Sequence, residues 1–175
     1  EMHLLHASHF ALFGQAELLE RSLSWYTDIL EGAYKRAREQ GYRGARWPKM
    51  TDPSGNDSPS AIGTLLCWQQ PHPIFYASLL RKTQIESALL TEWTEIIEAT
   101  AAFMVDYLQY DEQQDLYVLG PPLIPVQENH RPEETLNPTF ELSYWRWALQ
   151  EAVSLLKEAG RSVDEHWLHV LEKLA

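Results

Sequence analysis

The sequence has 175 residues, of which 45% are hydrophobic and 22% are charged, a balance typical of one folded domain and not of a disordered chain. With 14 basic and 25 acidic residues the net charge is −11, which argues against a nucleic-acid partner because such proteins carry a basic face. No apolar run reaches the ~20 residues that a membrane span requires, so we expect no membrane partner either. The single cysteine, Cys67, excludes an internal disulfide.

The spacing of apolar residues predicts an all-α fold with two kinds of helix. The helices at 2–13, 71–83 and 138–159 are short or apolar on all sides, which is typical of buried helices. The three that alternate with them carry an apolar stripe on one side only, and are expected to face water on the other. These striped helices are predicted at 16–39, 87–109 and 162–174, the last opening with a Ser162–Glu165 capping box.

The connections between these helices are unequal in length. Each inner helix is joined to the following outer helix by a tight turn, whereas the loops from outer to inner helices, 41–64 and 110–137, both exceed twenty residues. Loops of this length usually have a function. Both should lie at the end of the molecule where the inner helices begin, and we expect a site there.

Three hairpins of an inner and an outer helix form an arc of a helical toroid. An arc leaves apolar inner helices uncovered at both ends, so residues 1–175 are interpreted as a partial domain. We expect the missing cover to come from the rest of a longer chain or from self-association. The chain alone is predicted to expose apolar surface and to bind a hydrophobic dye.

Four segments of the loops and the helices after them resemble a known group of enzymes. They read GARWPKMTDPSG, WQQPHPIFYASLL, LGPPLIPVQENH and NPTFELSYWRWAL. Together they are similar to the six-hairpin glycosidases, which are (α/α)6-toroid enzymes, near the maltose/kojibiose phosphorylase-like and the inverting α-L-fucosidase families. The resemblance covers roughly 40–159 and implies about three of the six hairpins of that toroid.

Two carboxylates are catalytic candidates, the first of them implied by the resemblance. It puts the general acid in the loop of Glu128, where a carboxylic acid would protonate the leaving oxygen of a glycoside. Inverting hydrolysis needs a second carboxylate to activate water, and Glu141, in the first turn of the next inner helix, is a candidate. A carboxylate in a first turn is also favoured by the helix dipole alone, and the base of these enzymes can come from elsewhere in the sequence.

The sequence is rich in residues suited to binding an oligosaccharide or a glycoside, with seven Trp and eight Tyr. Indole rings pack on the apolar faces of sugars, and amides, imidazoles and guanidinium groups bind their hydroxyls. The candidates for substrate binding are Arg46, Trp47, Trp68, Gln69, His72, Asn129 and His130. We expect the first three and Glu128 to surround one hollow between the two long loops.

We expect no metal and no cofactor. His3, His6 and His9 fan out around their helix and do not converge, and the sequence has no His-Glu-x-x-His pattern and no Gly-rich nucleotide loop. The predicted function is that of an inverting glycoside hydrolase. Two alternatives stay open, a phosphorylase that uses inorganic phosphate and a non-catalytic helical module that binds sugars or proteins.

Overall fold

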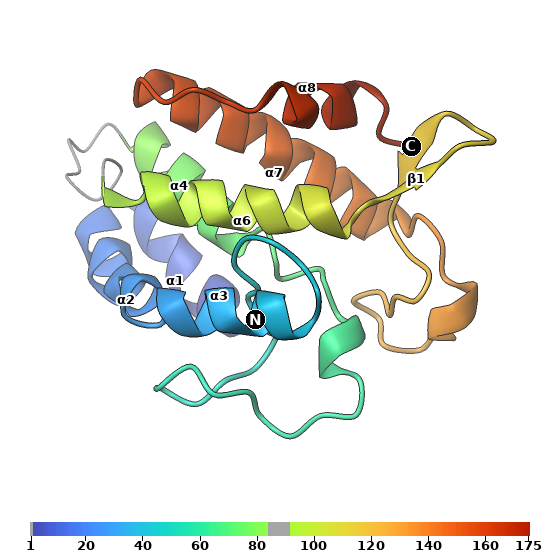
Figure 1. Ribbon diagram of the computed structural model, residues 1–175. Coiled ribbons are helices and arrows are strands. Elements are labelled where there is room, and N and C mark those ends of the chain that lie inside the picture. The colour runs from blue at the N-terminus through green and yellow to red at the C-terminus, as the bar shows by residue number, and fades with distance from the viewer. Residues whose placement is uncertain (1, 84–91) are drawn as a thin grey trace.

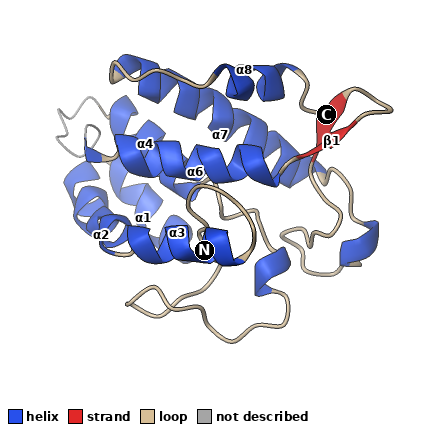
Figure 2. Ribbon diagram, viewed as in Figure 1, coloured by secondary structure: helices blue, strands red, loops and turns tan. Residues whose placement is uncertain are grey.

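The computed structural model describes residues 2–83 and 92–175, and in these ranges the chain is mostly helical with one small sheet (Figures 1 and 2). Most of the elements are helices, and a hairpin of two short strands lies at one end of them (Figure 1). The α-helices are α1 (Met2–Leu12), α2 (Ala16–Asp28), α3 (Leu30–Glu39), α4 (His72–Lys82), α6 (Thr94–Tyr107), α7 (Thr139–Glu158) and α8 (Glu165–Glu172). Two 3-10 turns, η1 (Gly63–Leu65) and η2 (Pro132–Glu134), lie in the loops, and the strands are β1 (Gln109–Asp111) and β2 (Leu116–Val118).

Helices that follow one another in the sequence pack together. Helix α1 packs on α2, α4 on α6, and α7 on α8, while α4 also contacts α1 and α7. Helices α6 and α7 run side by side across the molecule, with α8 against α7 at the edge (Figure 1). The all-α prediction is therefore confirmed at the level of fold class.

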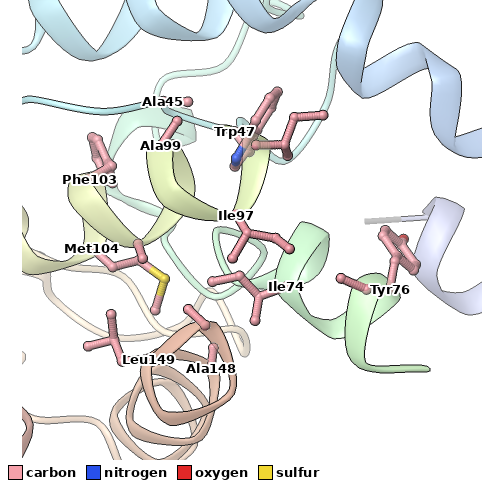
Figure 3. Close-up of a cluster of buried hydrophobic side chains, with 14 of the residues drawn as sticks. Ala45, Trp47, Ile74, Tyr76, Ile97, Ala99, Phe103, Met104, Ala148 and Leu149 are labelled. Carbon is pink, nitrogen blue, oxygen red and sulfur yellow. The ribbon is translucent and has the colours of Figure 1, made fainter. Parts of the chain in front are cut away.

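The core lies between α4, α6 and α7. Ile74, Ile97, Met104 and Leu149 point toward one another there (Figure 3), and Trp145 is also fully buried. Close packing of large apolar side chains from three helices makes this the rigid part of the molecule.

Helix α6 differs from its prediction. The pattern over 87–109 predicts a striped outer helix, but the buried face of α6 is wider than the stripe: Ala101 and Val105 are buried beside Ile97 and Met104, and only the side with Glu95 and Glu98 stays open. The predicted buried face was too narrow because α3, α4 and α7 all pack on this helix. The beginning of the predicted helix, with Leu89, lies outside the described residues.

Helix α1 shows the opposite departure. It was predicted to be buried, yet it fully buries only Ala7 and Ala11, and several of its large apolar side chains, among them Met2 and Leu12, are exposed. Leu5 is 65% exposed and Phe13, just past the helix, is 79% exposed. The expectation that the chain exposes apolar surface is thereby confirmed, whereas binding of a hydrophobic dye stays a prediction.

Two helix boundaries were predicted wrongly. The helix expected at 16–39 is divided at Ile29, whose side chain lies against Gly55 of the following loop. The last helix is capped by Asp164, which accepts from the His166 amide at 2.9 Å, and not by a Ser162–Glu165 box. A carboxylate is an equally good cap and adds a favourable charge at the positive end of the helix.

The predicted loop 110–137 contains most of the β1–β2 hairpin. Asp111 accepts hydrogen bonds from the Gln113 and Gln114 amides in its turn, and the Tyr117 amide donates to the Lys173 carbonyl at 2.8 Å. The hairpin thus holds the C-terminal residues.

Within the described ranges, no helix is long and apolar enough to cross a bilayer.

Candidate functional site

The two long loops meet beside the start of α4 and α7. The Ile124 amide donates to the Leu65 carbonyl at 2.9 Å, and Lys49 forms an ion pair with Glu128. The second loop is closed at its base, because the Leu119 amide donates to the Asn137 side chain and the Asn137 amide to the Leu119 carbonyl, both at 2.8 Å. The prediction that the loops lie together is confirmed.

Three hollows open around this meeting point. Hollow A, of about 1130 Å³, has walls that include Trp68, His72, Phe140, Glu141 and Tyr144. Hollow B, of about 130 Å³, lies between Lys49, Glu128, Ser60 and Thr64. Hollow C, of about 590 Å³, is bordered by Ser22, Trp25, Tyr26, Trp47, Gln69 and His72.

Glu141 is the carboxyl group with the most unusual surroundings. It stands in the first turn of α7, is fully buried, and its Oε1 accepts from the Val126 amide at 2.6 Å. Its Oε2 has no hydrogen-bond partner among the described residues. Burial raises the pKa of Glu141, and the bond from Val126 opposes part of that shift. A buried carboxyl group with a raised pKa at the wall of hollow A is suited to hold and release a proton.

His72, at the start of α4, also lines hollow A and contacts the helix that carries Glu141. Its Nδ1 lies 3.1 Å from the Tyr144 hydroxyl, and its Nε2 has no partner in the described part of the chain. Burial lowers the pKa of His72 to about 3, so the imidazole is neutral at neutral pH. A neutral imidazole offers one donor and one acceptor, which suits it to bind a hydroxyl group.

Glu128 occupies a different position from the one predicted. It lies at hollow B and is ion-paired to Lys49, whose side chain is 15% exposed. Its backbone has a φ of +57°, in the left-handed region that residues other than glycine rarely adopt. Such conformations are common at functional sites, and here the carboxylate is held against the ammonium group of Lys49.

Arg46 is almost fully buried at the edge of hollow B, where it holds the first long loop. It is 1% exposed, and its guanidinium group donates to the Leu66 carbonyl at 2.5 Å and to the Thr64 carbonyl at 3.3 Å. Its Cζ lies 5.2 Å from the centre of the Phe103 ring. That Arg46 binds substrate directly stays a prediction, since Arg46 lines hollow B while its hydrogen bonds hold the first long loop.

Trp47 and Gln69 belong to hollow C. The Trp47 indole donates to the Thr100 hydroxyl at 2.8 Å, toward the core, while its ring borders the hollow. The Gln69 Nε2 donates to the Trp47 and Leu66 carbonyls, both at 3.0 Å. The neighbouring Gln70 accepts from the Trp47 amide at 2.9 Å and donates to the Ala45 carbonyl at 2.8 Å, so these two amides fix the loop to the start of α4.

The expectation of one hollow shared by Arg46, Trp47, Trp68 and Glu128 was wrong. Successive side chains of an extended chain point to opposite sides, so Arg46 and Trp47 separate into hollows B and C. Trp68 and His130 line hollow A. Asn129 is exposed on the loop beside them.

The structure adds two residues that the sequence reasoning did not bring into the site. Tyr144 joins His72 at hollow A, and its position three residues after Glu141 on the same helix was the signal that could have found it. Lys49 pairs with a residue 79 positions away, and nothing in the sequence around a single loop lysine indicates such a partner.

Histidine, cysteine and carboxylate side chains do not gather into a metal site in the described ranges, since no group of three could hold an ion. His3, predicted not to be a ligand, lies with its Nε2 2.8 Å from the Ser22 hydroxyl.

Comparison with known proteins adds no family to this picture. A scan against protein-family models found no match, and a search of curated proteins found no similar sequence.

Proposed function

We propose that this chain is part of a carbohydrate-active enzyme, an inverting glycoside hydrolase whose active site is hollow A. The observation that supports this best is Glu141, a fully buried carboxyl group at an aromatic wall, whose pKa is raised and whose Oε2 has no partner in the described part of the chain. Glycoside cleavage requires a carboxylic acid that stays protonated until it gives its proton to the leaving oxygen. The resemblance of the loops and of the helix after them to the six-hairpin glycosidases agrees with this chemistry, and the mostly helical fold is compatible with it.

In this proposal Glu141 is the general acid. The sequence alone favoured Glu128 for that role, with Glu141 as the base. The geometry favours Glu141, because it is buried and holds no cation, whereas Glu128 is paired with Lys49 at another hollow. The Val126 amide orients the Glu141 carboxyl group by holding its Oε1.

The walls of hollow A provide the contacts that a sugar needs. Trp68, Phe140 and Tyr144 offer aromatic surface for the apolar face of a pyranose ring. The neutral His72 and the exposed His130 and Gln127 offer polar atoms for its hydroxyl groups. A partly apolar hollow with a few polar groups is the usual form of a small-molecule site.

Hydrolysis of alkyl and aryl glycosides by the complete enzyme to which we propose this chain belongs, and by its Glu141→Gln variant, tests the proposal. The amide has nearly the same shape but no proton to give, so activity on alkyl or 4-nitrophenyl glycosides should fall by ~10²–10⁴. Dinitrophenyl glycosides, whose leaving group departs without protonation, should be cleaved nearly as before. The product anomer, followed by proton NMR, should be inverted.

Glu134→Gln and Glu128→Gln are the matched controls. Glu134 also lines hollow A but is ion-paired to Arg131 at 2.8 Å on the surface, so its substitution should leave activity nearly unchanged. A loss that depends on the leaving group in Glu128→Gln, and not in Glu141→Gln, would assign the acid to Glu128. Turnover only in the presence of phosphate would identify a phosphorylase, and sugar binding without any turnover a non-catalytic module.

A further inference from the structure

Hollow C has the features of a binding site that the proposed reaction does not use. Its volume of about 590 Å³ falls within the ~300–1,000 Å³ usual for small-molecule sites. Trp25 and Tyr26 of α2 and Trp47 of the first long loop provide aromatic surface on its walls. The loop around Pro53 closes it on one side, and the Trp25 indole holds this loop by donating to the Pro53 carbonyl at 2.8 Å.

Two buried polar atoms at hollow C lack partners among the described residues. The amide of Gln69 is oriented by its surroundings, because its Nε2 lies between two backbone carbonyls and must be the donor. Its Oε1 is therefore an acceptor, and it is unpartnered although Gln69 is 2% exposed. The second atom is Nε2 of His72, a residue 3% exposed. Buried polar groups are nearly always hydrogen-bonded, so two such atoms at one hollow point to a ligand that binds them.

His72 also joins hollow C to hollow A, since it lines both. Its Nδ1 is engaged by Tyr144 on the side of hollow A. The two hollows therefore adjoin at this imidazole, with Glu141 on the wall of hollow A and the aromatic residues of α2 on the wall of hollow C. The ligand must combine apolar faces with several hydroxyl groups, as sugars do.

We infer that hollow C is a second sugar subsite, and that the substrate is an oligosaccharide of at least two units that spans hollows A and C across His72. This inference rests on the proposed function, because it names the substrate class of the same site. The hydroxyl groups of the second unit would bind Gln69 Oε1 and His72 Nε2, and its ring would lie against Trp25 or Trp47.

Binding measurements on the chain, without turnover, test the inference. Calorimetry would compare glucose, galactose and fucose with the disaccharides maltose, cellobiose and lactose. At least one disaccharide should bind about tenfold more tightly than its component sugars. In a ¹⁵N-tryptophan NMR spectrum that disaccharide should shift the indole signals of Trp25 and Trp68, and the monosaccharide only that of Trp68.

Two matched variants separate the hollows. Ser22→Trp fills hollow C from α2, and Ser143→Trp fills hollow A from α7. Ser22→Trp should remove the tenfold advantage of the disaccharide and leave monosaccharide binding within about twofold, whereas Ser143→Trp should weaken both. Circular dichroism checks that both variants fold, and the indole shifts of the unmodified chain remain a readout if either does not.

Each outcome decides the inference. A disaccharide that shifts only Trp68 and binds Ser22→Trp normally would refute a subsite in hollow C while leaving the hydrolase proposal intact. Binding across both hollows without hydrolysis would support the subsite and refute the hydrolase. Failure of every sugar to bind would refute both.

Discussion

Replacement of Arg46 by Met tests whether this residue holds the loops or binds a ligand. The side chain keeps most of its length and loses a guanidinium group that donates to the Leu66 carbonyl at 2.5 Å and to the Thr64 carbonyl at 3.3 Å. Hydrogen bonds to charged groups contribute ~1.5–3 kcal/mol each. Burial lowers the pKa of Arg46, which indicates that the charge is costly to bury, and its removal offsets part of the loss.

The free energy of unfolding of Arg46→Met should therefore fall by about 3 kcal/mol. With an m-value of about 2 kcal/mol/M, the urea midpoint should drop by about 1.5 M, followed by circular dichroism or tryptophan fluorescence. Arg43→Met is the matched control, because Arg43 is an exposed residue paired with Asp106 at 2.9 Å. Loss of a surface pair costs ~0.2–1 kcal/mol, so its midpoint should move by less than about 0.5 M. An unchanged midpoint in Arg46→Met, together with lost sugar binding, would refute the structural role.

Three further predictions concern backbone space and titration. Gly44→Ala should lower the free energy of unfolding several-fold more than Gly14→Ala. A Cβ at Gly44 would lie 2.3 Å from a backbone oxygen of α6, whereas Gly14 has a similar positive φ but open space around it. Urea unfolding compares the two variants, and equal losses would contradict the reasoning. The depressed pKa of His72, about 3, should make stability decline as pH falls from about 6.5 toward 3, and His72→Asn should flatten that decline in unfolding curves. The raised pKa of Glu141 acts in the opposite direction, because its contribution to stability is lost as pH rises through the pKa of the folded state. Glu141→Gln should therefore be more stable than the parent above that pKa, by about 1.4 kcal/mol for each unit of the shift, and equal to it below pH ~4.5. Parallel pH profiles of the two proteins would count against this.

The helices could be predicted because burial leaves a periodic trace in the sequence. Leu19, Leu23 and Ala33 recur at helical spacing and are buried as expected. The sequence could not show how many neighbours a helix has, so α6 was predicted with one buried side although three helices pack on it. The β1–β2 hairpin was missed because its strands have three residues each, too few for an alternating pattern to appear.

The site was predictable as a region but not as a set of contacts. Loop length located the meeting of the two loops, and the resemblance drew attention to Glu128 and Glu141. The direction of each side chain depends on tertiary hydrogen bonds that leave no local trace. Trp47 is turned by its bond to Thr100, and Glu128 is drawn toward Lys49, 79 positions away.

The paired amides of Gln69 and Gln70 have a consequence for variation among sequences of this kind. They fasten residues 45–47 to the start of α4, so the chain between 48 and 64 leaves and returns at two fixed points. Lengthening such a loop adds little entropic penalty, since each doubling costs only about 0.6 kcal/mol. This excursion contributes the outer wall of hollow C and no residue of hollow A. Insertions there would reshape the far end of the binding region and leave the surroundings of Glu141 as they are, so the length of ligand accepted could diverge while the chemistry stays constant.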